Sequence, residues 1–140
     1  MNFLLITMGG VHHENGEQVI EKWNSVFKAL SSEPRRQIIV SLLDAGPDQS
    51  VPLPESAMMP NVPPNMRQLR QELHHVHLPM LADMGFITWE AEPLIAARGP
   101  RFDEVAVVFE ALHAEASRIP NSLVLGCQRL EEEQQNSVNL

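Results

Sequence analysis

Residues 65–89 read NMRQLRQELHHVHLPMLADMGFITW, and this stretch decides the predicted fold. Its apolar residues recur at steps of three and four, the spacing that places side chains on one face of an α-helix. The stripe consists of Met66, Leu69, Leu73, Val76 and Met80. We therefore predict one long helix over residues 65–84 that packs this stripe inward.

The residues after this helix predict a β-hairpin. Gly85 stands where a helix commonly ends on a left-handed residue, and Pro79 predicts a bend or a distorted last turn. Beyond Gly85, aromatic and β-branched residues predict strands at 86–89 and 94–97 around a short turn. A long helix followed by a hairpin is typical of a winged helix-turn-helix domain, so the predicted fold class is mainly α with a small β-hairpin.

Further helices are predicted on both sides of this unit. Residues 17–30 carry apolar side chains at helical spacing, and a second helix begins at Pro34 and ends before Gly46. The same spacing predicts a helix over 102–118. Residues 123–135 predict a helical tail that includes a solvated run of three glutamates.

The stretch 47–64 interrupts the helical pattern with six prolines. Proline removes a backbone donor and clashes with the preceding turn, so no long helix can cross this stretch. It allows a short edge strand at 51–53 and a short helix at 54–59.

The chain is predicted to have one folded domain with two extensions. Residues 1–16 are expected to be a disordered or frayed N-terminal extension, residues 17–118 the winged-helix domain, and residues 119–140 an acidic C-terminal tail. The formal net charge is −8, and seven acidic residues against two basic ones lie in 102–140. Because the rest of the chain is nearly neutral, binding to nucleic acid would have to rest on a local surface.

Two features bear on location. Cys127 is the single cysteine, so no intrachain disulfide can form, which fits a reducing compartment. No apolar run approaches the roughly 18 residues that span a bilayer. We predict a cytoplasmic protein with no contact with a membrane.

The polar side of the long helix holds the candidate DNA contacts. Arginine can pair with guanine edges or with phosphate, and glutamine can pair with adenine. The predicted contacts from the helix and from the segment after the hairpin are Arg67, Arg70, Gln71, His74, His75, Arg98 and Arg101.

Each of these predictions has a structural alternative. The helix face can simply be solvated, and Arg98 and Arg101 can pair with nearby glutamates. Of Arg35 and Arg36, which open the second helix, we expect one to bridge to an acidic partner.

Other chemistries find little support in the sequence. His74, His75 and His77 cluster on the helix, but no second ligand pair stands at a recognisable spacing, so we predict no metal site. We expect His77 to be partly buried. No nucleophile elbow, glycine-rich phosphate loop or paired CxxC motif occurs, so we predict no cofactor and no enzyme activity.

Two segments resemble a known family. Residues 27–43, FKALSSEPRRQIIVSLL, resemble the opening of ArsR-type winged-helix regulators, and residues 73–87, LHHVHLPMLADMGFI, resemble their recognition helix and the start of the wing. With RGPRFD at 98–103, the same segments look still more like haloarchaeal winged-helix domains of mostly unassigned function. The resemblance covers roughly residues 19–113.

The resemblance implies a homodimeric DNA-binding transcriptional regulator; some family members sense metals. The long helix would enter the major groove, the wing would reach the adjacent backbone, and the first and last helices of the domain would pair two chains.

Two departures from the family pattern motivate an alternative. The proline-rich stretch replaces an ordinary short helix, and Glu90 and Glu92 occupy the wing tip, where lysine or arginine would bind phosphate. The alternative is a protein-interaction module that does not bind DNA and engages a protein partner through its acidic C-terminal segment.

Overall fold

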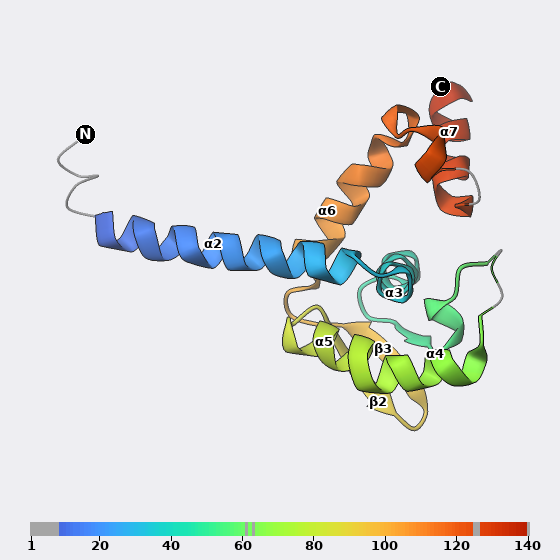
Figure 1. The fold of residues 1–140 in the computed structure, drawn as a ribbon, viewed down its shortest axis with the longest axis horizontal. Coiled ribbons are helices and arrows are strands. Elements are labelled where there is room, and N and C mark those ends of the chain that lie inside the picture. The colour runs from blue at the N-terminus through green and yellow to red at the C-terminus, as the bar shows by residue number, and fades with distance from the viewer. Residues whose placement is uncertain (1–8, 61, 63, 125–126, 140) are drawn as a thin grey trace.

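The computed structural model describes residues 9–60, 62, 64–124 and 127–139, and over them the chain is mainly helical with one small antiparallel sheet (Figure 1). This confirms the predicted class of a mainly α protein with a hairpin. The principal elements are α2 (Gly9–Leu30), α3 (Glu33–Ala45), β1 (Ser50–Pro52), α4 (Met66–Glu72), α5 (Leu78–Asp83), β2 (Ile87–Ala91), β3 (Leu94–Arg98), α6 (Phe102–Ala114) and α7 (Gln128–Asn139).

The sheet has three strands in the order β1-β3-β2, so the predicted hairpin gains a third strand. Ala96 of β3 lies between Val51 of β1 and Trp89 of β2. The edge strand predicted at 51–53 is confirmed, and Pro52 is tolerated there because an edge strand need not donate every hydrogen bond. The predicted short helix is one 3-10 turn, Glu55–Ala57.

The hydrophobic core lies between α3, the long helix, the sheet and the first half of α6. Burial of these aliphatic and aromatic side chains is the main favourable term in folding. The largest fully buried side chains include Ile38, Ile39, Leu42, Leu73, Leu78, Leu81, Phe86, Ile87, Phe102 and Val105.

The first helix is longer than predicted. α2 begins at Gly9 rather than at residue 17, so the part of the expected N-terminal extension that the structure describes, residues 9–16, is helical. Residues 1–8 of that extension lie outside the described residues. α2 projects from the body as an arm, and its buried residues, Val26 and Ala29, lie near its C-terminal end (Figure 1).

The long helix contains a wide turn that the sequence pattern did not predict. Between α4 and α5, residues Leu73–His77 form a π-helical turn, closed by a bond from the Leu78 N–H to the Leu73 carbonyl. Pro79, the second residue after it, has no N–H with which to bond the His75 carbonyl. The wide turn takes up the distortion expected at this proline.

The π-turn also corrects the predicted inward stripe. Leu69 and Leu73 are buried as predicted, but Val76, within the turn, is 44% exposed. Met66, which begins α4 ahead of the turn, is 39% exposed independently of it. An extra residue in the turn rotates everything after it around the helix axis. The buried positions downstream are therefore His77, Leu78 and Leu81.

Gly85 ends the helix as predicted, with φ at +79°, in the left-handed region that favours glycine. Gly99, at the far end of the hairpin, lies against it: a Cβ at Gly99 would stand 2.6 Å from the Gly85 carbonyl oxygen. This close approach joins the base of the hairpin to the end of the long helix.

The C-terminal region departs from prediction in its bounds. α6 ends at Ala114, and Ala116–Arg118, predicted to continue it, form a 3-10 turn. α7 occupies Gln128–Asn139 instead of 123–135. It is tied to the rest of the chain by Arg129, whose Nη1 lies 2.9 Å from an Asp44 carboxylate oxygen, and by Gln134, which donates to the Ala116 carbonyl at 2.8 Å. Within the described residues, no helix has the length and hydropathy that crossing a membrane requires.

Candidate nucleic-acid interface

The outer side of α4 is accessible, as the sequence predicts. Asn65 caps this helix, since its Oδ1 accepts a hydrogen bond of 3.1 Å from the Gln68 N–H. From that start, the side chains of Arg67, Arg70 and Gln71 are exposed. His75, in the π-turn, is exposed as well.

Arg67 and Arg70 differ from the other arginines of the chain. Across the ranges that the structure describes, they alone have guanidinium groups with no hydrogen bond or ion pair. An exposed guanidinium with all its donors available is suited to a phosphate or to the edge of guanine. The two are three positions apart, a spacing at which helical side chains are neighbours.

His74 connects the helix to the hairpin. It is half-buried; its Nδ1 lies 3.1 Å from the Arg70 carbonyl, and its ring meets Trp89 of β2 edge-on, with centroids 5.8 Å apart. Trp89 is partly exposed beside it. His74 is therefore less available to a ligand than His75, although both were predicted as contacts.

Arg98 has a structural role in place of the predicted phosphate contact. Its Nε and Nη2 donate to the Leu42 carbonyl at 3.3 and 3.1 Å, and its guanidinium lies over the Phe102 ring, 4.8 Å from the centroid. These bonds add a side-chain donor to the C-terminal end of α3, where the Leu42 carbonyl also accepts the Gly46 N–H at 3.3 Å. Arg98 is therefore not part of the candidate interface.

Arg101 follows the alternative interpretation, pairing with a glutamate. Its Nη2 and Nε lie 2.8 and 3.1 Å from Glu104 Oε1, and the side chain remains about one-third exposed. The hydrogen bond from Arg101 lowers the pKa of Glu104 below its ordinary value. The pair with Glu104 engages Nε and Nη2, so a phosphate contact would compete with Glu104 for these donors.

The tip of the hairpin carries negative charge. Glu90 and Glu92 are exposed on and beside the turn between β2 and β3. Phosphate groups repel carboxylates, so this tip is unsuited to a close backbone contact.

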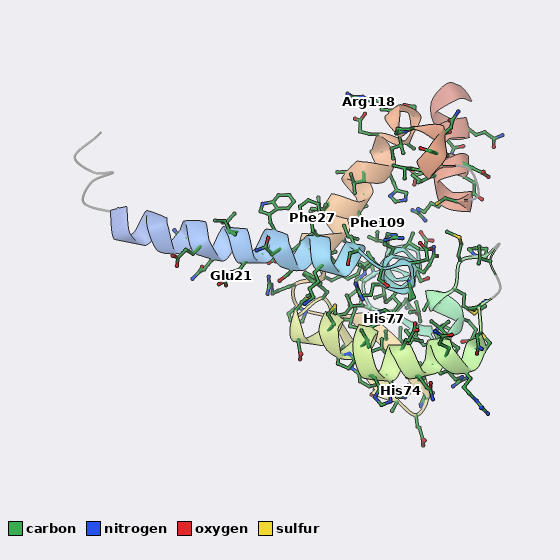
Figure 2. All side chains as sticks on the ribbon, in the orientation of Figure 1. Glu21, Phe27, His74, His77, Phe109 and Arg118 are labelled. Carbon is green, nitrogen blue, oxygen red and sulfur yellow. The ribbon has the colours of Figure 1, made fainter. Side chains whose placement is uncertain are left out.

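The inner side of the long helix contains a polar network that the sequence did not predict. Arg35 is 6% exposed and His77 is 7% exposed. Arg35 Nη1 lies 2.8 Å from His77 Nδ1, while Nε and Nη2 donate to the carbonyls of Ala29 and Lys28 at 3.1 and 2.9 Å. Figure 2 shows His77 on the side of the helix that faces α3 and His74 on the side turned away.

The expected arginine–carboxylate bridge belongs to Arg36, which pairs with Glu33 at 2.9 Å. Arg35 has no carboxylate partner among the described residues and uses neutral acceptors instead. Burial and the neighbouring Arg35 lower the pKa of His77, against a smaller opposite effect of Glu72. The sequence indicated the partial burial of His77 but contained no signal for its partner, 42 residues away.

A second surface is apolar. On α2, Val19, Ile20, Trp23 and Phe27 are 52, 61, 48 and 60% exposed, and Trp23 stacks on Phe27 with centroids 5.7 Å apart. Val107 of α6 is 62% exposed and lines, with Val19 and Trp23, a groove of about 260 Å³ between the two helices. Figure 2 shows Phe27 on α2 close to the point where α6 passes that helix.

No group of three histidine, cysteine, aspartate or glutamate side chains within the described ranges is placed to hold a metal ion. His77, turned inward, does not share a face with His74. Comparisons with models of protein families, with curated proteins and with solved structures found no match to this chain.

Proposed function

We propose that this protein is a winged-helix DNA-binding regulator of the ArsR-like type, acting by binding and not by catalysis. The observation that carries the proposal is the pair of unengaged arginines, Arg67 and Arg70, exposed on a helix that leads into a hairpin. In winged helices such a helix enters the major groove, and this resemblance is the reason for choosing DNA as the ligand.

The contacts follow from side-chain chemistry. Arg67 and Arg70 would bind guanine edges or phosphates, Gln71 is suited to adenine, and His75 would donate to either a base or a phosphate. A contribution from Arg101 would compete with its pair to Glu104. Since so few cations are available, the dependence of affinity on salt should be shallow, with a slope set by about two to four phosphate contacts.

The acidic C-terminal helix does not oppose this arrangement. α7 lies at the end of α6, on the opposite side of the body from α4 and α5 (Figure 1). Its glutamates are thus separated from the proposed interface by the thickness of the domain, and salt screens charges at such distances. The nearer repulsion comes from Glu90 and Glu92 at the hairpin tip.

The proposed form is a homodimer joined through α2 and α6. Val19, Ile20, Trp23 and Phe27 form one apolar face on an arm, and the described residues leave this face about half exposed or more. Burying a large apolar side chain contributes roughly 1.5–3 kcal/mol, so a second copy packed on this face would gain substantially. Two copies would double the number of available arginines.

A fluorescence polarisation titration with labelled random-sequence duplex at two salt concentrations tests the proposal. We expect binding that weakens with salt and is lost in the double variant Arg67→Ala/Arg70→Ala. Arg118→Ala is the matched control, because Arg118 is exposed, pairs with Glu115 and lies beyond α6, away from the interface. Absence of salt-dependent binding at low salt would refute DNA binding.

The second candidate is a protein-interaction module, favoured by Glu90 and Glu92 at the hairpin tip. In that case the wild-type chain and the double arginine variant would show the same absence of DNA binding. A basic partner protein would bind in their place, and neutralising the acidic C-terminal segment would weaken that complex.

A further inference from the structure

The buried contact between Arg35 and His77 constrains the protonation state of His77. A guanidinium N–H can only donate, so at 2.8 Å the Nδ1 of His77 must accept the hydrogen bond from Arg35 Nη1. The imidazole is then neutral, with its proton on Nε2. A protonated imidazole has donors at both nitrogens, and two donors cannot face each other at this distance.

The contact lies at a point where the regular backbone hydrogen bonds of the long helix are interrupted. His77 is the last residue of the π-turn Leu73–His77, and Pro79 provides no N–H to the preceding turn. α4, which carries Arg67, Arg70 and Gln71, is on one side of this turn, and α5, which packs on β2, is on the other. Side-chain contacts at the turn therefore help to set how α4 is presented.

Arg35 also connects this turn to the first helix. Besides His77, it donates to the carbonyls of Lys28 and Ala29 near the end of α2, and to Ser31 Oγ at 3.0 Å. One guanidinium thus joins the arm proposed for dimerisation, the start of α3 and the π-turn of the long helix.

We propose that His77 is a positioning residue that holds α4 in its DNA-binding arrangement only while its imidazole is neutral, so that acidification weakens DNA binding through His77. This inference rests on the proposed function, because DNA binding is the property that is modulated.

The charged groups around His77 define two states. Arg35, from α3, faces Nδ1, and Glu72, from the same helix, lies with Oε2 3.8 Å from Nε2. Among the described residues, α2 contributes the carbonyls of Lys28 and Ala29 to this network. The Lys28 side chain itself is exposed. Protonation adds a second cation beside Arg35 and strengthens the attraction to Glu72. The imidazole would therefore leave Arg35 and move toward Glu72, releasing the π-turn.

Two other histidines act in the opposite direction. His74 and His75 lie on the outer side, and their protonation would add positive charge near DNA and strengthen binding. The pH profile of the wild type alone would mix these effects. A comparison with a His77 variant cancels them, since both proteins retain His74 and His75.

The deciding variant is His77→Asn. The Asn Oδ1 occupies about the place of the imidazole Nδ1 and accepts a hydrogen bond from Arg35, but the amide does not titrate. Duplex affinity would be measured for both proteins from about pH 8 to about pH 5.5, the range in which histidine commonly changes charge. We expect similar affinities at the upper end. At the lower end we expect the wild type to be weaker than His77→Asn by about fivefold or more, the lower end of the usual range for coupled sites.

Parallel profiles of the two proteins would overturn the inference. Thermal melting at each pH establishes that both remain folded, so that lost affinity is not unfolding. An imidazole NMR titration gives a readout without DNA: His77 should be the Nε2–H tautomer and, on protonation, should shift the amide signals of residues 73–78. Absence of those shifts would also overturn it. Absence of duplex binding at every pH in both proteins would instead refute the proposed function.

Discussion

Arginines on opposite sides of the long helix have different roles, and burial explains the difference. Arg35 is enclosed behind the helix, and its guanidinium is engaged by His77, by two carbonyls and by Ser31. Arg67 and Arg70, on the outer side, are exposed and unengaged within the described residues. A buried cation must have its donors satisfied, because its desolvation is costly. An exposed one keeps its donors for a ligand.

The comparison predicts a large difference in stability. Arg35→Ala should lower the free energy of unfolding by about 3 kcal/mol, because it leaves the Ala29 carbonyl and the buried Nδ1 of His77 without their donor. Arg67→Ala should change it by no more than about 0.5 kcal/mol. Urea unfolding followed by circular dichroism measures both. Equal effects of the two substitutions on the free energy of unfolding would contradict a structural role for Arg35 alone.

On the outer side of the helix, the expected effect is on DNA affinity. Arg67→Ala should cost about 1–3 kcal/mol of binding free energy if Arg67 pairs with a base, together with a loss of preference at that base. A phosphate contact would instead weaken all sequences alike and reduce the salt slope by about one. Polarisation titrations with a panel of duplexes separate these outcomes, and Arg118→Ala should leave all of them unchanged.

Acid should destabilise the folded chain through His77, on the inner side of the long helix. Because the pKa of His77 in the folded chain is below its unfolded value, its contribution to stability is complete above the unfolded pKa of about 6.5. That contribution is lost as the pH falls from about 6.5 toward the folded pKa, with a slope of at most about 1.4 kcal/mol per pH unit. Melting curves of wild type and His77→Asn should diverge in this window. If they stay parallel, His77 does not take part in acid destabilisation.

The smallest expected effect concerns the hairpin tip. Glu90→Gln with Glu92→Gln removes two exposed charges and should strengthen duplex binding by a few tenths of a kcal/mol at low salt, with less gain as salt screens the repulsion. Stability should not change measurably. An unchanged affinity at low salt would indicate that the tip lies away from the duplex.

Much of this fold could be predicted from local signals. The spacing of apolar residues predicts α3 and the first half of the long helix, Gly85 ends that helix, and the change of period marks β2 and β3. These signals suffice because each element must bury one face, and that face repeats with the element's own period. The accessibility of Arg67 and Gln71 followed from the same reasoning, since they lie opposite Leu69 and Leu73, and Arg70 lies on a flank of the same helix.

The sequence alone determined which elements form and which side of α4 turns outward, because periodicity and helix-ending residues act over a few positions. Only the tertiary structure decided that a π-turn would expose Val76, that Arg35 would meet His77, and that Arg98 would bind the end of α3 instead of remaining free. The physical reason is the separation of the interacting residues along the sequence. These outcomes depend on donors and acceptors brought together from residues 42 and 56 positions apart, and no local pattern encodes which acceptor a buried guanidinium will find.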